Sequence, residues 1–402
     1  MKKVVGMSLV TAVLLGASAF AVDNVKVSGD AKLYYYTDDK NTGDLFSKTT
    51  SAADTALRLG VTGDLLKNIS FGLTGYAVST LGLENNLVSN TWSSAHTSTA
   101  SGVADAAWLG ELWIAGTYGK TTLKAGRMLL DSPLSFSETW SIAPNSYEAI
   151  VLINQDIPDT TLLAVYAGHS NEVDDSNLSN VTGIDKIVGP GGKFGTHGIS
   201  GANVFGIINN TYKPLTAQAW YYDVVSLADA FWLQGDVNCE LVKGLKFGAQ
   251  YAEISPKAGY SSYHDSKGYA LKAGYEGIEN LKVSVAYSDV DKDSVFKIAN
   301  LATNNSVSQS KLYTEAFWNY GYVGTPDAQS WNLTAEYNVQ EIAKFGAYYT
   351  NVSIDKTNTD MKELALSATK SFGALDTTLA YVSTDVDGSQ SNAIQAYLTL
   401  NF

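Results

Sequence analysis

The chain is poor in cysteine and arginine, with a single cysteine, Cys239, and two arginines, Arg58 and Arg127. One cysteine excludes an intramolecular disulfide, whereas cell-surface domains of the secreted type more often carry paired cysteines. Basic residues are also in deficit, with 27 Lys and Arg against 40 Asp and Glu, so the formal net charge is −13. This balance argues against nucleic acid as a partner, because neutralising phosphates requires clustered lysines and arginines.

Long apolar runs are absent after residue 21. No later stretch reaches 18 consecutive apolar residues, which excludes a membrane-spanning helix there. The first 21 residues instead form a secretory signal, with Lys2 and Lys3 at the start, an apolar stretch, and small residues ending at Ala21. We expect cleavage near Ala21, and the loss of both lysines takes the net charge from −13 to −15.

What the chain does contain is aromatic residues and alternating strands. It has 24 Tyr, 13 Phe and 8 Trp, although only 45% of its residues are hydrophobic. The last nine residues alternate strictly, and because strand side chains repeat every two residues, one side of that strand is apolar. Its members are Ile394, Ala396, Leu398, Leu400 and Phe402. Apolar outer sides, polar inner sides and many aromatics are typical of a transmembrane β-barrel.

Alternation and turn residues together predict eighteen strands. They lie near 24–37, 53–64, 69–79, 106–117, 121–129, 147–155, 160–169, 203–211, 215–224, 229–241, 244–254, 268–276, 280–289, 330–338, 342–352, 361–371, 374–384 and 392–402. Tight turns alternate with longer polar connections such as 38–52, 80–105 and 385–391, which fits short periplasmic turns and long external loops. We therefore predict an all-β antiparallel barrel over 22–402 with eighteen strands, sixteen being the alternative.

The lumen-facing side of the predicted strands carries seven acidic and seven basic residues. Those that we assign to the pore wall are Asp30, Lys32, Arg58, Glu111, Lys124, Lys272 and Glu336. Eighteen strands enclose a space too wide for side chains to fill, so we expect it to hold water. Such a balanced wall gives little selectivity, and the excess acidic residues then lie in loops and turns. An acidic mouth concentrates cations, which predicts a weak to moderate cation preference.

The connection 130–146 mixes apolar and acidic residues, as a loop folded into the lumen requires. We predict that it forms the pore constriction with Asp131, Glu138 and the nearby Glu148. Arg127 precedes the loop and is assigned to the same constriction. Alternation with Leu123 and Ala125 nevertheless points Arg127 towards lipid. Either a bulge turns it inward, or it lies at the rim as an interfacial anchor.

A longer motif around this loop resembles a known family. Its parts are Gly126-Arg127, Asp131-Ser-Pro133, Pro144-Asn-Ser-Tyr-Glu148 and Asn154-Gln-Asp-Ile-Pro-Asp-Thr-Thr161. They resemble the porin D (OprD-like) family, in the form found in epsilon-proteobacterial major outer-membrane proteins. The resemblance implies an eighteen-stranded channel in Gram-negative outer-membrane lipid, constricted by its third loop and often by a later one, here 290–329. Phe402 looks like the terminal aromatic by which the barrel-assembly machinery recognises its clients.

Three functions are compatible with the sequence. The first is a passive channel for ions and small hydrophilic solutes. The second is a channel specific for one small solute, such as an amino acid or a carboxylate. In the family that this chain resembles, such specificity is associated with a ladder of arginines along the pore wall. This chain has only two arginines, which are too few for such a ladder. The third is a surface or adhesion barrel that acts through its long loops.

Enzymatic activity, a cofactor and a bound metal are not expected. A barrel hydrolase needs a histidine beside a serine on the outer wall, and the four histidines lie in loops or at strand ends. The run from Asp289 to Asp293 resembles the start of a calcium loop but lacks the glycine and glutamate that such a loop needs later. The 80–105 loop resembles the second loops of trimeric porins, which contact a neighbouring barrel. A homotrimer is therefore one option for assembly.

Overall fold

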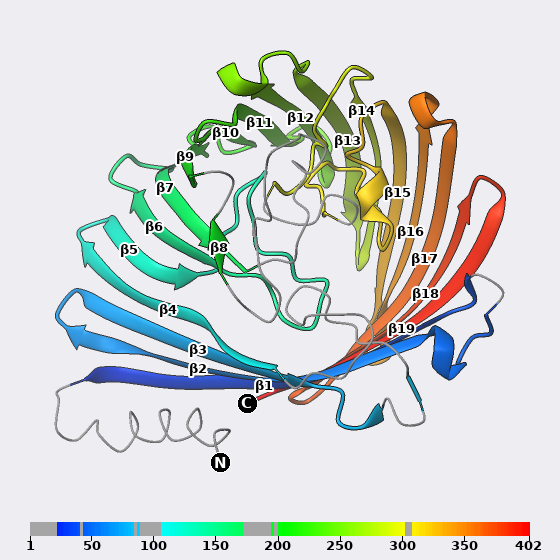
Figure 1. Cartoon of the computed structure of the whole chain (residues 1–402), viewed down its shortest axis with the longest axis horizontal. Helices are drawn as coiled ribbons and strands as arrows, with labels where there is room; N and C mark the ends of the chain where they lie inside the picture. The colour runs from blue at the N-terminus through cyan, green and yellow to red at the C-terminus, as the bar shows by residue number, and fades with distance from the viewer. Residues whose placement is uncertain are drawn as a thin grey trace.

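The computed structural model describes residues 22–40, 43–83, 87–88, 106–171, 194–196, 200–301 and 308–402. The predicted signal segment, most of the 80–105 loop and residues 172–193 lie outside this part of the chain. The described strands form a ring, with loop segments inside it (Figure 1). None of the helices in the described residues is long and apolar enough to cross a membrane.

The strands follow one another around the ring in sequence order. They are β1 (Asp23–Asp38), β2 (Ser51–Leu66), β3 (Ile69–Ser79), β4 (Ala106–Tyr118), β5 (Thr121–Met128), β6 (Tyr147–Asn154), β7 (Thr160–Ser170), β8 (Gly195–Thr196), β9 (Ala202–Asn209), β10 (Leu215–Val224), β11 (Ala228–Asn238), β12 (Leu245–Pro256), β13 (Ser266–Ile278), β14 (Leu281–Val290), β15 (Ala328–Val339), β16 (Ala343–Ile354), β17 (Thr359–Phe372), β18 (Leu375–Val386) and β19 (Ser389–Asn401). Short 3-10 helices occupy Lys48–Thr50, Ala258–Tyr260, Tyr320–Tyr322 and Asp355–Thr357.

Every pairing between neighbouring strands is antiparallel, and β1 pairs with both β2 and β19, so the sheet closes. The two-residue strand β8 pairs only with the end of β7, and β7 pairs directly with β9. The ring therefore consists of eighteen full strands plus one short extra strand. The predicted antiparallel barrel and its strand number are confirmed.

One predicted connection is wrong in length. The stretch 385–391 was expected to be a longer loop, but β18 continues to Val386 and β19 begins at Ser389. Asp387 and Gly388 alone form the turn, both with positive φ angles of 53° and 81°. An Asp-Gly pair is favoured in such two-residue hairpin turns because both positions require positive φ. The Asp-Gly pair therefore indicates the tight turn that is present here, whereas the polar composition of 385–391 had indicated a longer loop.

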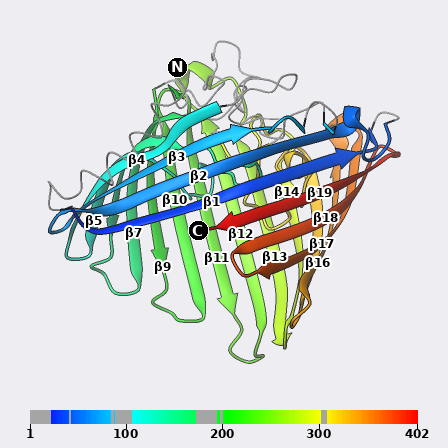
Figure 2. The ribbon, with the colours of Figure 1, turned by 90° about the horizontal axis from the view of Figure 1, so that it is seen from below.

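The ring closes on the last residue of the chain. Gly29 N–H donates to the Phe402 carbonyl at 2.8 Å, and Phe402 N–H donates back to the Gly29 carbonyl at 3.0 Å. Figure 2 shows β1 and β19 side by side, with the C-terminus at this seam. The Phe402 ring lies over Gly29, where an added Cβ would be only 2.5 Å from the ring. Glycine at this position therefore leaves room for the terminal ring.

The two sides of the sheet differ as alternation predicts. Large apolar residues on the outer side are well exposed, for example Leu271, Trp331 and Leu333 at 53% each. Residues on the inner side of the same strands, such as Ala270 and Ser330, are fully buried. Because the inner side is the one against which the interior loops pack, the outer side is the lipid-facing one.

The Gly29 seam gives a test of barrel closure. We expect Gly29→Ala to lower the free energy of unfolding by roughly 1–3 kcal/mol, the usual range for overpacking, because the new methyl group clashes with Phe402. The measurement is the thermal or urea-induced unfolding of the detergent-solubilised protein. Gly75→Ala is the matched control, since a Cβ there meets nothing nearer than 4.0 Å. Equal stability of the two variants would contradict the role assigned to Gly29.

Candidate functional site: two loops inside the barrel

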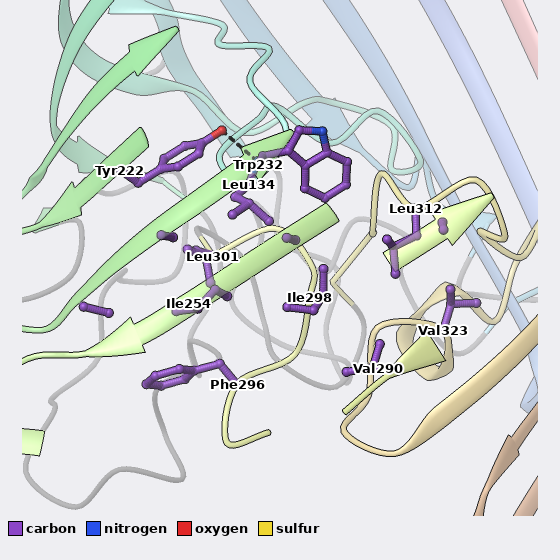
Figure 3. Packing of buried hydrophobic residues seen from close by; sticks show 14 of the residues in the cluster. Leu134, Tyr222, Trp232, Ile254, Val290, Phe296, Ile298, Leu301, Leu312 and Val323 are labelled. Carbon is purple, nitrogen blue, oxygen red and sulfur yellow. Dashed lines mark hydrogen bonds between the residues drawn. The ribbon is translucent and has the colours of Figure 1, made fainter. Parts of the chain in front are cut away.

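A hydrophobic core lies inside the barrel, on the inner side of strands β9–β17. Trp232, Tyr222 and Ile254 from the wall are each no more than 1% exposed. Two loops pack further residues against this wall (Figure 3). Leu134 comes from the third loop (129–146). Phe296, Ile298, Leu301, Leu312 and Val323 come from the later loop, described over 291–301 and 308–327. Both predicted inward loops therefore reach the lumen.

The third loop crosses the lumen from one wall to the other. Near β10, the Leu134 N–H donates to the Tyr222 hydroxyl at 3.1 Å (Figure 3). Farther along the loop, Ile142 is fully buried in a second cluster with residues of β1, β2 and β3. Lys32 of β1 donates to the Ile142 carbonyl at 3.3 Å. Since β1 and β10 lie about half a ring apart in the strand order, the loop is fixed at two opposed walls.

The two loops are joined at Glu138, which is 4% exposed. Its carboxylate accepts from the side chain of Asn300 and from the Gln309 N–H, both at 3.0 Å, and from the Trp140 indole at 2.7 Å. The Asn300 amide also donates to the Phe136 carbonyl at 2.8 Å. A buried charge needs such partners to offset its desolvation. Glu138 therefore braces the junction between the loops.

A second carboxyl group lies in the same junction. Glu315 of the later loop is partly buried, and its Oε1 is closed off from solvent and has no hydrogen-bond partner. Burial, reinforced by the negative charge of Glu138, raises the pKa of Glu315 to about 8. The Ser310 N–H and the Lys311 charge act in the opposite direction. Glu315 is consequently protonated and neutral at pH 7, which allows two carboxyl groups to share one buried site.

The far end of the later loop is held by Glu363 on β17. Its carboxylate accepts from the backbone N–H groups of Phe317 and Asn319, each at 2.7 Å. The Asn319 side chain adds a further bond at 2.7 Å. Glu363 is 1% exposed, and Phe317 packs against Tyr348 on the neighbouring strand. The Trp318 N–H, between Phe317 and Asn319, donates to the same carboxylate at 3.2 Å, so one buried group fixes three consecutive loop residues to the wall.

The predicted pore-wall residues lie on the lumen side of their strands. Asp30 and Arg58 form an ion pair between β1 and β2. Lys124 lies over the Trp113 ring at 4.1 Å, and Glu111 follows a bulge in the β3–β4 ladder. Glu336 accepts from Lys344 at 2.8 Å. Lys32 and Lys272 both approach loop residues, Lys32 through the Ile142 carbonyl and Lys272 at 5.4 Å from the Tyr313 ring.

The four residues assigned to the constriction do not come together. Asp131 lies on the third loop, with 87% of its side chain exposed, and pairs with Lys311 of the later loop. Glu138 is buried at the loop junction. Arg127 and Glu148 instead bond to each other at 2.8 Å, on the side of the wall that carries Leu123 and Ile150.

This placement of Arg127 and Glu148 differs from the expectation that they line the pore. The register between β5 and β6 is continuous from Thr121 to Met128, so no bulge turns Arg127 inward. The guanidinium lies 3.9 Å from the Phe194 ring centre and donates to the Leu109 carbonyl. His169 completes the cluster at 3.1 Å from Glu148. The geometry favours the interfacial-anchor interpretation of Arg127.

Three residues that hold the loops were not identified from the sequence: Tyr222, Asn300 and Glu363. Their partners lie 88, 164 and about 45 residues away, which no local pattern indicates. Only Glu363 has a local signal. It is an acidic residue between Met361 and Ala365 on the inner side of its strand, and both neighbours are fully buried. Among the described residues, no three His, Cys, Asp or Glu side chains gather as a metal site would require.

A closed eighteen-strand barrel with an apolar outer side and loops folded into its lumen defines an outer-membrane channel of the porin class. Residues 18–384 match the family model described as outer membrane porin, OprD family. The chain belongs to the OprD family of porins, as its sequence motif indicated, and its place is the outer membrane of a Gram-negative bacterium. No curated protein matches the chain by sequence.

Solved porin structures share the fold. Pseudomonas aeruginosa OccK8 (OprE) is similar with a TM-score of 0.75 and 15% identity, covering 94% of this chain and 98% of that one. P. aeruginosa OpdK, solved with vanillate, gives 0.72 and 12%, with the same coverage of 94% and 98%. P. aeruginosa OprD gives 0.70 and 12%, covering 94% and 95%. At such identities the likeness concerns the fold alone.

Glu363 allows a test of how the later loop is held. We expect Glu363→Ala to release residues 317–319, because their buried N–H groups lose a charged acceptor at a cost of about 1–3 kcal/mol each. Hydrogen exchange at these amides should accelerate at least tenfold. Glu336→Ala is the control, since Glu336 has the same charge and faces the lumen but bonds to wall residues. Unchanged protection at residues 317–319 would contradict the anchor.

Glu315 makes the loop junction sensitive to pH. The folded protein keeps this proton up to about pH 8, whereas an ordinary glutamate releases it near 4.5. Stability therefore falls as pH rises from 4.5 to 8, by on the order of 1.4 kcal/mol per pH unit, and levels off above 8. We expect Glu315→Gln to remove this part of the slope in urea unfolding followed from pH 5 to 9. An identical slope in both proteins would show that Glu315 is not buried in this way.

Proposed function

We propose that the protein is a passive aqueous channel for ions and small hydrophilic solutes. The observation that carries this proposal is a set of exposed charges on the inner side of the barrel. The side chains of Lys246 and Lys344 are 46% and 50% exposed there, and that of Glu276 is 34% exposed. Charged groups so exposed require water, since lipid does not solvate them. A water-filled lumen provides the path for solutes.

We place the narrowest part of this path at the third loop, where it meets the later loop. The third loop reaches opposed walls and Glu138 ties it to the later loop, which supports this assignment. Asp131 is the acidic residue of this region whose side chain is exposed to water. Arg127 and Glu148 are not part of the proposed constriction, because they lie on the outer side of the wall.

We further propose a weak cation preference. The overall charge of −13 supports it, as does the exposed Asp131 at the constriction. The buried Glu138 and Glu363 contribute less, because their carboxylates are occupied by hydrogen bonds and closed off from solvent. Charges exposed to salt water act over only about 8–10 Å at physiological ionic strength. The preference should therefore be modest and should decrease at high salt.

A reversal-potential measurement in a planar bilayer tests this proposal. We expect stable conductance and a permeability ratio of K⁺ to Cl⁻ above 1 in a KCl gradient. Asp131→Asn should lower that ratio by roughly twofold at 0.1 M salt and by less at 1 M, because salt screens the lost charge. Glu279→Gln in a tight turn removes the same charge as a control. Anion preference in the unmodified protein would contradict the selectivity, and no conductance would contradict the channel.

A second candidate function is a channel specific for a small anionic solute. It is favoured by Lys246, Lys272 and Lys282, which lie on three adjacent strands and all face the lumen. The third alternative, adhesion through external loops, concerns the loops 80–105, 170–202 and 290–329. Most of the first two lies outside the described residues, and the described part of 290–329 packs inside the barrel.

A further inference from the structure

A trough crosses the lipid-facing side of the wall on strands β13–β16, which lie side by side in Figure 1. Its volume is about 540 Å³, and its outward-pointing lining residues are alanine, valine, leucine and tyrosine. Short side chains form its floor, because Val283 stands opposite Ala335, and Ala335 stands opposite Ala347. Tyr275 of β13 stands opposite Val283 and ends the row. With strands about 4.8 Å apart, the row from Tyr275 to Ala347 is about 14 Å long.

Larger side chains stand on both sides of this floor and give the trough its depth. Towards the external loops they are Leu333 and Tyr349, which are opposite each other on β15 and β16. Towards the periplasm they are Tyr337 and Phe345, opposite each other on the same two strands. All four side chains are well exposed and project from the wall. The floor is therefore a groove between two raised rows.

The trough lies in the periplasmic half of the wall. Val283 is two residues beyond the start of β14, and Ala347 is four residues beyond the start of β16. Both strands begin at short turns. At about 3.4 Å per residue, both positions lie within about 14 Å of those turns along the strand. Since the hydrocarbon core of a bilayer is about 30 Å thick, the trough faces lipid tails rather than water.

An acyl chain suits this groove better than the wall of a second barrel. Apolar surfaces that meet inside a bilayer release no water, so their contact depends on van der Waals packing. A second copy of this chain presents separate projecting side chains on its outer side, such as Leu271 and Leu333. Isolated side chains fill only part of a row about 14 Å long. An extended hydrocarbon chain follows the row and contacts the floor and both edges along its length.

A cationic group lies beyond the periplasmic edge of the trough. Lys370 of β17 shares the lipid-facing side with Leu364 and Leu366, because residues two apart along a strand share a side. Its ammonium donates to the Glu341 carbonyl at 2.6 Å and lies 5.3 Å from the Phe372 ring. Among the residues that the structure describes, no carboxylate lies within ion-pair distance of it. An ammonium has three donors, so N–H groups of Lys370 remain for a further acceptor.

A small residue connects the lysine with the trough. Ala368 lies between Lys370 and Leu366 on the lipid-facing side of β17, and it stands opposite Phe345. Leu366 stands opposite Ala347 on the trough floor. The lysine is thus four residues, or about 14 Å along the strand, from the level of the floor. Ala368 leaves room for a hydrocarbon chain between the two.

We propose that this surface binds one phospholipid, with an acyl chain in the trough and the phosphate at Lys370. The alanine floor and the raised rows hold the hydrocarbon, and the N–H groups of one ammonium hold the phosphate. The positive charge at one end selects a phosphate-bearing lipid over a neutral one. Because the site faces away from the lumen, the inference is independent of the solutes that pass through the channel.

Native mass spectrometry of the detergent-solubilised protein, titrated with palmitoyl-oleoyl phosphatidylglycerol, tests this site. We expect Ala347→Phe to weaken binding of the first lipid by about tenfold, because the new ring fills the floor. Lys370→Gln should weaken it by about fivefold, through the loss of one contact between lysine and phosphate. Ala335→Phe repeats the filling on the neighbouring strand, so that a folding defect of one variant does not decide the result.

Two variants on the same side of the wall are matched controls. Ala219→Phe adds the same ring to the lipid-facing side of β10, away from the trough. Lys362→Gln removes the same charge from the lipid-facing side of β17, at its external end. Both should leave binding of the phospholipid unchanged. Equal binding by the trough variants, the Lys370 variant and these controls overturns the proposal.

Further ligands identify what the site recognises. Palmitoyl-oleoyl glycerol lacks the phosphate and should bind the unmodified protein as weakly as phosphatidylglycerol binds Lys370→Gln. Inorganic phosphate at millimolar concentration should not displace the phospholipid. Displacement by inorganic phosphate overturns the proposal and indicates a site for the free anion. Association of barrels that Ala347→Phe abolishes also overturns it, because the trough would then be a contact with a second copy.

Discussion

The whole structure depends on the pairing of backbone amides in a medium that offers them no water. A strand edge left open in lipid would expose a row of unsatisfied N–H and C=O groups, each costing several kcal/mol. The first and last strands therefore have to meet, and they do so over the full length from Asp38 and Ala393 to Gly29 and Phe402. Because every pairing around the ring is antiparallel, the number of long strands is even, and β8 is only a short addition beside β7. Phe402 forms the outermost backbone pair of this seam, with Gly29.

Inside the ring the loops fold as a water-soluble protein does, by burying apolar side chains and pairing buried polar groups. The loops carry their own hydrophobic core and fix it to the wall with buried carboxylates, at Glu138 between the loops and at Glu363 on β17. Acidic residues in the sequence suggest attraction of cations, but the carboxylates of Glu138 and Glu363 are occupied by hydrogen bonds inside the protein. The proposed ion preference then depends on the few charges that remain exposed, such as Asp131. Glu315 is protonated for a related reason, because a second buried negative charge beside Glu138 would destabilise the folded protein.

The strands could be predicted because each one carries its own signal. Alternation in β12–β15 separated lipid-facing residues such as Leu271 and Leu333 from lumen-facing ones such as Lys272 and Glu336. Alternation also placed Arg127 on the outer side, and the same reading applied to Tyr147, Ala149 and Val151 would have placed Glu148 there. The loop contacts were beyond this approach. Whether Glu138 meets Asn300, or Glu363 meets Asn319, depends on how two loops fold inside a closed space. The sequence pattern around an acidic loop residue does not differ between one that faces water and one that bonds to a neighbouring loop.

The third loop has a mechanical consequence. It is attached near β10 through Leu134 and Tyr222 and near β1 through Ile142 and Lys32. A wide barrel with a wall one sheet thick is easily deformed. Its cross-section can become oval without breaking hydrogen bonds between the strands. A segment fixed to opposed walls acts as a strut against that deformation. The cross-section of the barrel should then depend little on lateral pressure in the surrounding lipid, because the loop holds two opposed walls at a fixed distance.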